Sequence, residues 1–222
     1  MKQFYNVFNN EKVSPLVTQL SWSHYLLLIS INDYDEINYY IEQIKKRMLS
    51  KRELQIIIKN QEYQRLSIET RKKLKAKKEV EIKDLVPNPI LIKNKNNIEI
   101  INEKVLHNLI LENIELFMKE LGNGFSFIGS EYKIKIGDYY HKIDLLLFNI
   151  KYNSYVVVEL KTTEFKAEHI SQVQKYMNFV DKNIKEISNN NTIGILICKK
   201  ENKYIIKYFS DDRIAIREYE LV

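Results

Sequence analysis

The sequence is poor in the residues that mark disulfide-rich, fibrous and disordered proteins. Among 222 residues there are one cysteine, five glycines and three prolines. A single thiol, Cys198, can form neither an internal disulfide nor a thiolate metal cluster, which excludes disulfide scaffolds and zinc fingers. So little glycine and proline, beside 45% hydrophobic residues, excludes collagen-like and disordered chains. The composition predicts a folded protein with a sizeable core.

Long apolar segments are also missing. The first residues, Met1–Tyr5, contain no apolar stretch of the kind found in signal peptides. The runs at Tyr25–Ser30 and Val156–Val158 fall far short of the ~18 residues that a membrane span needs. With a single cysteine, the chain is predicted to be neither secreted nor membrane-embedded, and a reducing cytoplasm is the expected location.

Basic residues outnumber acidic ones. There are 35 Lys and Arg against 29 Asp and Glu, and the formal net charge is +6. Such a balance favours a polyanionic partner such as nucleic acid. The abundance of Lys, Ile, Asn and Tyr is equally typical of an A·T-rich genome, so composition alone does not decide the partner.

Residues 1–70 are predicted to form a helical domain. Apolar residues recur at helical spacing from Asp33 to Leu49. The tetrapeptide Ser50-Lys51-Arg52-Glu53 is a capping box, in which the Ser hydroxyl and the Glu carboxylate satisfy exposed amides at a helix start. Two short helices in succession fit a small DNA-binding unit, and they fit a helical cap on the rest of the chain equally well.

A basic linker is predicted over residues 71–98. Its second half, from Pro87 to Asn97, is turn-prone. Its first half carries a run of cations that could contact phosphates, or could simply form a solvated helix end. The candidate nucleic-acid-binding residues are Arg71, Lys72, Lys73, Lys75, Lys77 and Lys78.

The rest of the chain, residues 99–222, alternates between helix and strand patterns. One long helix is expected from its cap at Asn102 to the stop at Gly122, and a second over Ala167–Asn183. Strands are expected at 125–128, 132–136, 140–148, 155–161, 192–198, 204–209 and 214–220. This order predicts an α/β (α+β) domain, a mixed sheet flanked by helices.

One strand of this domain contains an unusual charge. Asp144 lies among apolar residues, and a carboxylate so placed needs a partner or a metal. Further along the chain, Glu159 and Lys161 share one face of a strand because strand side chains alternate. A hairpin turning at 151–154 would set residue 144 opposite roughly residue 160. The three side chains are therefore predicted to meet.

Two carboxylates at one point repel each other unless a cation lies between them. Hard oxygen ligands with room for water suit Mg²⁺ or Mn²⁺. A lysine beside the metal, Lys161, can orient the attacking water and stabilise charge on a phosphoryl oxygen. The alternative is a strand-end ion pair, because a Glu-x-Lys triplet often occurs by chance.

These residues resemble the PD-(D/E)XK nuclease superfamily, in which an Asp on one strand and Glu-x-Lys on the next build a metal site. The closer resemblance is to the YhcG-like (DUF1016) group, and it covers nearly the whole chain. It is carried by the segments Ser21–Tyr25, Ser50–Leu54, Phe117–Phe125, Ile143–Leu146 and Val158–Lys161. The resemblance implies a restriction-endonuclease-like nuclease domain and a helical, partly winged-helix-like N-terminal domain that binds DNA.

The resemblance also implies roles for single residues. Asp144 and Glu159 would be metal ligands and Lys161 a catalytic residue, supported by Gln172 and Tyr176 on one face of the following helix. Many relatives carry a Glu where this chain has His107, and Glu103, one turn earlier, could replace it as a ligand. His141 and His169 are expected at the surface.

Family members generally begin well before the segment that is Phe4-Tyr5 here, so the N-terminal domain is expected to lack its first part. The expected function is that of a Mg²⁺-dependent DNA endonuclease, with Mn²⁺ as an alternative metal. A catalytically weak or inactive DNA-binding module of the same fold, and an RNA-directed nuclease, stay open. A homodimer is also expected, because one metal site cuts one strand.

Overall fold

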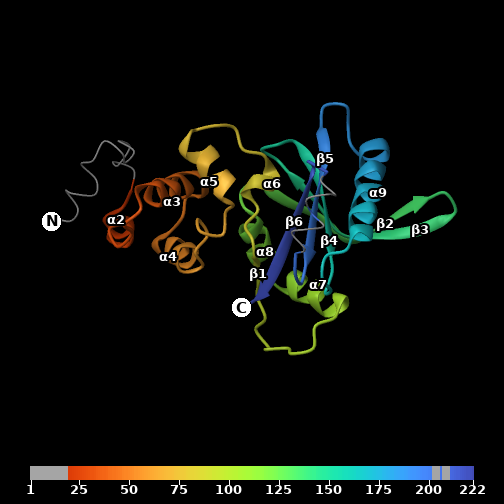
Figure 1. Cartoon of the computed structure of the whole chain (residues 1–222), viewed down its shortest axis with the longest axis horizontal. Helices are drawn as coiled ribbons and strands as arrows, with labels where there is room; N and C mark the ends of the chain where they lie inside the picture. The colour runs from red at the N-terminus through yellow and green to blue at the C-terminus, as the bar shows by residue number, and fades with distance from the viewer. Residues whose placement is uncertain (1–19, 202–205, 207–210) are drawn as a thin grey trace. The chain divides into compact units, whose positions relative to one another are not determined.

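The computed structural model describes residues 20–201, 206 and 211–222. The chain divides into two compact units, of which the first ends at Val80 and the second begins at Glu81. Figure 1 colours the elements in chain order. Across the described residues, no helix combines the length and the apolar character that a bilayer crossing requires.

The first unit is helical. Its elements are α2 (Trp22–Leu28), α3 (Tyr34–Arg47), α4 (Lys51–Lys59) and α5 (Ile68–Lys75), and residues 20–80 contain no strand. The predicted capping box is present at the start of α4, where the Glu53 amide donates to the Ser50 hydroxyl and the Ser50 amide donates to the Glu53 carboxylate. Tyr40, Ile41 and Leu54 lie in one buried cluster, because the apolar faces of α3 and α4 pack together.

The second unit is a six-stranded mixed sheet in the order β1-β6-β5-β4-β3-β2. The pairs β2–β3 and β3–β4 are antiparallel, and the pairs β4–β5, β5–β6 and β6–β1 are parallel. The bounds are β1 (Ile90–Ile92), β2 (Phe125–Ile136), β3 (Tyr139–Asn149), β4 (Ser154–Leu160), β5 (Asn190–Cys198) and β6 (Ile214–Leu221). The predicted mixed sheet is confirmed.

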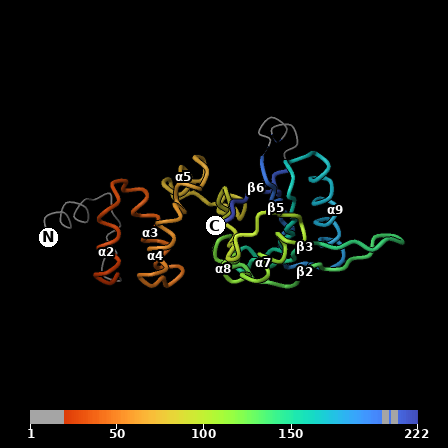
Figure 2. Tube along the Cα trace, turned by 90° about the horizontal axis from the view of Figure 1, so that it is seen from below, coloured from red at the N-terminus to blue at the C-terminus, as the bar shows by residue number. Residues whose placement is uncertain are grey.

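Helices cover both faces of the sheet (Figures 1 and 2). The helix α9 (Ala167–Asn183) packs on the face that carries Leu146, Val157 and Leu196. The helices α7 (Glu103–Glu112) and α8 (Ile114–Leu121) pack on the face that carries Leu147 and Val158. Alternating residues of each buried strand therefore enter two different cores, which is why these strands are apolar on both faces.

The segment expected to be a linker is largely folded. It contains the end of α5, the short helix α6 (Ile82–Leu85) and β1, which pairs in parallel with β6 near the end of the chain. Ile90 and Ile92 are buried in the core. A three-residue strand has almost no periodicity of its own, so only its pairing with a distant strand reveals it.

Two predicted elements differ in their bounds. The long helix expected over 102–121 is broken at Asn113, whose backbone is not helical and whose side-chain amide donates to the Leu109 carbonyl. The strands expected at 125–128 and 132–136 form one strand, β2, with a shift in register between Phe127 and Gly129. The strand expected at 204–209 falls, apart from Ile206, outside the described residues.

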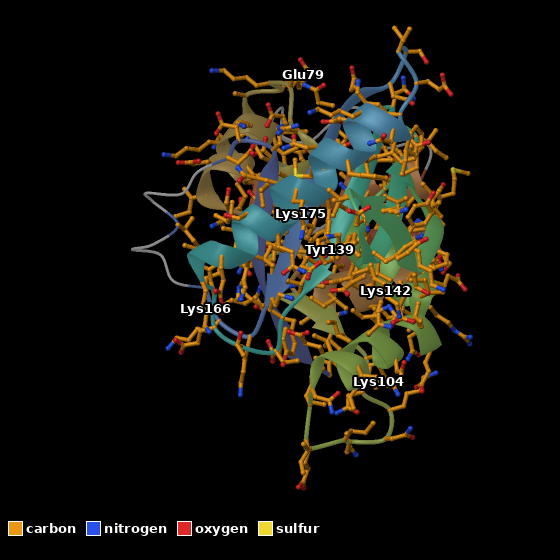
Figure 3. The ribbon with its side chains drawn as sticks, turned by 90° about the vertical axis from the view of Figure 1, so that its right-hand side faces the viewer. Glu79, Lys104, Tyr139, Lys142, Lys166 and Lys175 are labelled. Atoms are coloured by element: carbon orange, nitrogen blue, oxygen red, sulfur yellow. The ribbon has the colours of Figure 1, made fainter. Side chains whose placement is uncertain are left out.

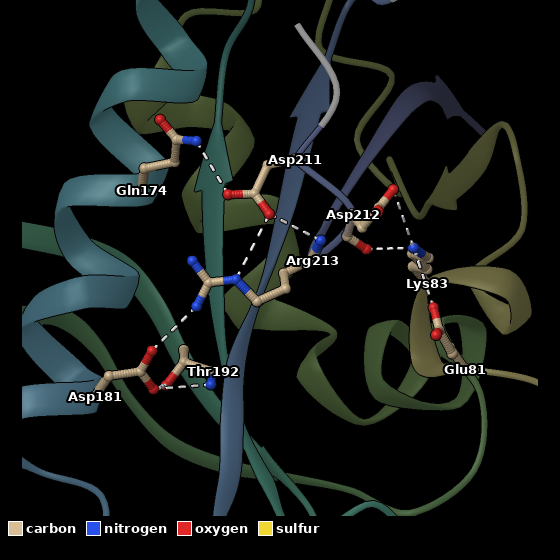
Figure 4. A network of polar contacts seen from close by, with 8 residues as sticks. All are labelled: Glu81, Lys83, Gln174, Asp181, Thr192, Asp211, Asp212 and Arg213. Carbon is tan, nitrogen blue, oxygen red and sulfur yellow. Dashed lines mark hydrogen bonds and ion pairs between the residues drawn. The ribbon is translucent and has the colours of Figure 1, made fainter.

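A network of hydrogen bonds and ion pairs joins α9 to β5 and to the segment just before β6 (Figure 4). The Asp181 carboxylate accepts hydrogen bonds from the amide and the hydroxyl of Thr192 at 2.9 and 2.6 Å, and from the Arg213 guanidinium at 3.1 Å. The Gln174 side chain donates to Asp211 at 3.0 Å. These bonds fix the rotation of α9 and therefore the face that it turns toward the sheet.

The close packing of α9 on the sheet depends on a glycine in β5. A Cβ atom built at Gly194 would lie 2.5 Å from Val173 Cγ1 and 2.8 Å from Met177 Sδ. We expect Gly194→Ala to lower the free energy of unfolding by about 1–3 kcal/mol, because the helix must move away. Urea denaturation measures this change. The matched control is Gly129→Ala, whose Cβ would meet Tyr132 at an ordinary 3.5 Å and should leave stability nearly unchanged.

Candidate active site

The two predicted carboxylates lie side by side at the end of the β3–β4 pair. The last paired residues are Leu145 and Val158, so Asp144 and Glu159 are the next residues along the two strands. The predicted register set residue 144 opposite roughly residue 160, one position further along. The Asp144 carboxylate accepts a hydrogen bond of 2.8 Å from the Leu160 amide, which holds that side chain across to the neighbouring strand.

Lys161 contacts Glu159 and Glu103. Its ammonium group donates to Glu159 Oε1 at 2.8 Å and lies 3.7 Å from Glu103 Oε1, which comes from the first turn of α7. Glu159 is 2% exposed and the Lys161 side chain 13%. The end of one strand pair and the start of one helix thus place two carboxylates against Lys161, with the charge of Asp144 close enough to raise the pKa of that lysine further.

This cluster leaves one buried oxygen without a partner. Glu159 Oε2 is inaccessible to solvent and makes no hydrogen bond. A buried carboxylate oxygen without a partner costs free energy, because water no longer solvates it. Glu159 Oε2 can therefore interact with one further positively charged group.

Burial and charge shift the ionisation of the cluster. Burial, followed by the charge of Asp144, raises the pKa of Glu159 to about 7 although Lys161 opposes the shift. Burial likewise raises the pKa of Asp144. Burial alone would lower the pKa of Lys161, but its hydrogen bond to Glu159 and the neighbouring carboxylates outweigh burial and hold that pKa above its usual value. Burial is therefore the main cause for the two carboxylates, and their negative charges are the cause for Lys161.

The face of α9 that turns toward the cluster carries the predicted supporting pair. The Gln172 side-chain amide donates to the Tyr176 hydroxyl at 3.2 Å. Burial raises the pKa of Tyr176, and the charges of Glu159 and Asp144 add to this rise. The Tyr176 hydroxyl therefore lies within electrostatic range of both carboxylates.

His107 and Glu103 both lie on the side of α7 near the site, but they contact different groups. The His107 ring nitrogen Nε2 lies 3.2 Å from the backbone carbonyl oxygen of Asp144. Glu103, one turn earlier, reaches Lys161 instead. Of the two residues considered for the remaining ligand position, Glu103 is the one whose carboxylate faces the charged cluster.

Two known protein families match two parts of the chain. Residues 83–222 match the family described as the YhcG PDDEXK nuclease domain. The chain belongs to this YhcG nuclease family. Residues 1–65 match the DUF1016 N-terminal domain, the companion domain expected from the sequence. The predicted resemblance is confirmed over both parts of the chain.

A curated relative and two solved structures are similar to parts of this chain. The putative nuclease YhcG of Escherichia coli (strain K12) is 23% identical over 185 residues, which are 81% of this chain and 49% of the relative. The chain thus spans about half the length of that relative. A repair endonuclease from Pyrococcus abyssi matches 57% of this chain and 49% of its own at 21% identity, and EndoMS in complex with double-stranded DNA matches 58% and 48% at 18% identity, each with a TM-score of 0.37.

The cluster of this YhcG-family chain supplies few metal ligands by itself. Within the described residues, no group of three or more His, Cys, Asp or Glu side chains is arranged to hold a metal ion. Nucleases of the PDDEXK superfamily generally use divalent metal ions. Mg²⁺ in particular binds through one or two carboxylates and fills its other positions with water and substrate phosphates. Asp144 and Glu159 with its unpartnered oxygen fit that pattern.

His169, which was expected at the surface, is a buried neighbour of the site. It is 6% exposed, and its Nδ1 accepts a hydrogen bond from the Lys166 amide at 3.2 Å. Burial lowers the pKa of His169, and the charge of Lys161 lowers it further. The signal was present in the sequence, because His169 lies four residues before Val173 on the apolar face of α9.

The basic residues proposed for nucleic-acid binding differ in their surroundings. Lys75 forms an ion pair with Asp35 at 2.7 Å, and the Arg71 guanidinium lies 5.6 Å above the Tyr63 ring. These two cations are engaged within the first unit. Of the other members of the set, Lys72, Lys77 and Lys78 are exposed and Lys73 is half-buried.

Proposed function

We propose that this chain is an endonuclease that hydrolyses phosphodiester bonds of DNA with Mg²⁺, or alternatively Mn²⁺, held by Asp144 and Glu159. The observation that carries the proposal is the buried, partnerless oxygen of Glu159 beside a second carboxylate and a lysine. A structural ion pair would satisfy its own oxygens, whereas this cluster carries an excess of negative charge. Glu103 is the candidate for a further ligand.

The bound metal would polarise the phosphate and favour ionisation of the attacking water. The residues of the chain would do the rest. Lys161 would bring its ammonium group to the phosphoryl oxygen on which negative charge grows during in-line attack. The Leu160 amide would hold the Asp144 carboxylate in place, and Gln172 with Tyr176 would orient the groups on the side of α9.

The substrate would be held mainly through its backbone. The net charge of +6 would attract the phosphates, and the exposed Lys72, Lys77 and Lys78 would contact them, which gives affinity without base readout. Such binding weakens steeply with salt.

RNA remains the alternative substrate, and cleavage of matched single-stranded DNA, double-stranded DNA and RNA separates the two. The homodimer and the cytoplasmic location also stay predictions.

Supercoiled plasmid at low salt tests the proposal. We expect nicking or linearisation with Mg²⁺ or Mn²⁺ and none with a chelator, and we expect Lys161→Ala to slow cleavage by roughly 10²–10³-fold. Lys119→Ala removes a lysine from the exposed side of α8 and serves as the matched control that keeps wild-type cleavage. Cleavage by Lys161→Ala at the wild-type rate would contradict the assigned role of that lysine.

A second candidate function is a DNA-binding module of the same fold without catalysis. It is favoured by one observation, the presence of His107 at the Asp144 carbonyl, a position at which the family resemblance implies a Glu. Salt-sensitive DNA binding by a wild-type protein that cleaves with neither metal would establish this function in place of the nuclease.

A further inference from the structure

The hairpin formed by β2 and β3 projects beyond the ends of the other strands of the sheet (Figures 1 and 2). β2 pairs with β3 from Asn149 to Tyr139, whereas β4 pairs with β3 only as far as Leu145. The outer part, Glu131–Ile143, therefore extends past the point where Asp144 meets Glu159. We call this part the arm.

One face of the arm is anchored. Ile134 and Ile143 are 3% and 0% exposed, and both belong to the buried cluster that includes Met177 of α9. Tyr132 and Ile136, which alternate with Ile134 along β2, pack against the same cluster. The arm is therefore fixed to the second unit by apolar burial and is no free loop.

The opposite face of the arm is exposed and carries lysines. Lys133 lies directly opposite Lys142, a cross-strand pairing of like charges that costs stability when nothing neutralises it. Lys142 bonds Glu131 at 2.8 Å, which balances one charge of the two. Lys135 lies opposite Tyr140, with its ammonium 5.7 Å from the ring centre. Lysines in this arrangement suit an anionic ligand lying along the arm.

The tip of the arm exposes two aromatic rings. Tyr139 and Tyr140 follow the turn at Gly137, and each is 75% exposed. Tyr140 lies opposite Lys135 on the lysine face, whereas Tyr139 lies opposite Ile136 and therefore on the other face of the hairpin. Aromatic side chains usually bury most of their area, so exposed rings at the tip indicate a site that binds something flat and apolar. Lysines along a strand and aromatic rings at its end are the combination with which proteins hold single-stranded nucleic acid.

Cations continue from the arm to both sides of the catalytic cluster. The hydrogen bond from Lys142 lowers the pKa of Glu131, and the charges of His107 and Lys104 on α7 lower it further, so these groups are neighbours. On the side of α9, Lys175 Nζ lies 3.5 Å from His141 Nδ1. Figure 3 shows Lys104, Lys142, Tyr139 and Lys175 on the end of the molecule from which the arm projects.

We propose that the arm binds the substrate strand next to the cut, with its lysine face on the phosphates. The rings at the tip, Tyr140 on the lysine face and Tyr139 on the other face, would stack on unpaired bases. This inference rests on the proposed function, since the strand that lies on the arm is the strand that enters the cluster. It adds a preference for DNA that is single-stranded or unpaired beside the scissile phosphate, because rings can stack only on bases that are free of a partner.

The length of the arm sets where the unpaired bases should lie. Four to five residues separate Asp144 from the two tyrosines, which at the usual rise of a strand is ~13–17 Å. Stacked nucleotides are spaced ~3.4 Å apart along one strand. The preferred substrate should therefore be unpaired about 4–5 nucleotides from the cut, on one side only.

Fluorescence anisotropy in a chelator separates binding from cleavage. The probes are a labelled duplex and the same duplex with a short unpaired stretch. We expect the wild type to favour the unpaired probe by roughly tenfold. Tyr139→Ala/Tyr140→Ala should remove that preference, and Tyr139→Phe/Tyr140→Phe should keep it because the rings remain. Both tyrosines are largely exposed, so these variants should melt like the wild type.

The lysine face is tested in the same assay. Lys133→Ala/Lys142→Ala should weaken binding of both probes and reduce the slope of log affinity against log salt by about 2. The matched control, Lys119→Ala/Lys182→Ala, removes two exposed lysines from α8 and α9 and should change the slope little.

The outcomes distinguish this inference from the proposed function. Arm-dependent preference in a protein that never cleaves would support the arm and reject the nuclease. Cleavage with Mg²⁺ by arm variants that bind both probes like the wild type would support the nuclease and reject the arm. A change of oligomeric state in Tyr139→Ala/Tyr140→Ala, with DNA binding unchanged, would also reject the arm and indicate an interface between copies of the chain.

Discussion

Replacing Glu159 with glutamine is expected to slow cleavage strongly and to make the metal-free protein more stable. The variant keeps the shape of the side chain but removes the charge that a divalent ion needs, so cleavage should fall on the order of 10³-fold. In the absence of metal, the same charge destabilises the folded protein. It is buried beside Asp144 with one oxygen unpartnered, and a glutamine in its place would carry no net charge into the core.

Thermal unfolding measures the second half of this expectation without reference to activity. At pH 8 in a chelator, Glu159→Gln should be more stable than the wild type by roughly 2 kcal/mol. Adding Mn²⁺ or Mg²⁺ should raise the melting temperature of the wild type and leave that of the variant unchanged. The control Glu164→Gln, at an exposed acidic residue, should behave like the wild type in both measurements.

A wild type that is more stable than Glu159→Gln in the chelator, and that gains nothing from either metal, would contradict this account. Glu159 would then be the acidic half of a structural ion pair with Lys161, held at 2.8 Å for stability. On the proposed function, stability without metal and cleavage with metal would make opposite demands on Glu159, as is common at catalytic sites.

The stability of the metal-free protein should fall as pH rises from about 4.5 to about 7. The folded protein holds a proton on Glu159 up to about pH 7, whereas the unfolded chain releases it near 4.5. Between these values the native state binds more protons than the unfolded state, so each increase in pH favours unfolding. The expected loss is roughly 2–4 kcal/mol across this window.

Urea titrations at half-unit steps from pH 4.5 to 8 measure this slope. Asp144, whose pKa is also raised by burial, adds to it, whereas His169, whose pKa is lowered by burial, opposes it near pH 6.5. The difference between the wild type and Glu159→Gln isolates the contribution of one group. A difference that stays constant across the window would show that Glu159 is ionised in the folded protein throughout.

The sequence by itself brought Asp144, Glu159 and Lys161 together, because the geometry of this cluster is local. Side chains alternate along a strand, which sets Glu159 and Lys161 on one face, and a short hairpin brings Asp144 to them within one residue of the observed register. The capping box at Ser50 and the helix α9 were read correctly for the same reason, since caps and helical spacing involve residues a few positions apart.

Tertiary structure alone decided whatever depends on residues far apart in the chain. The strand β1 exists because β6, some 130 residues later, pairs with it, and the helix break at Asn113 fits the two helices to one core. Burial of His169 and the partnerless oxygen of Glu159 follow from what packs around them. Local residue patterns specify which way a side chain points. Packing against residues far away in the chain determines which groups that side chain contacts and how well water solvates it, and therefore whether it carries a charge.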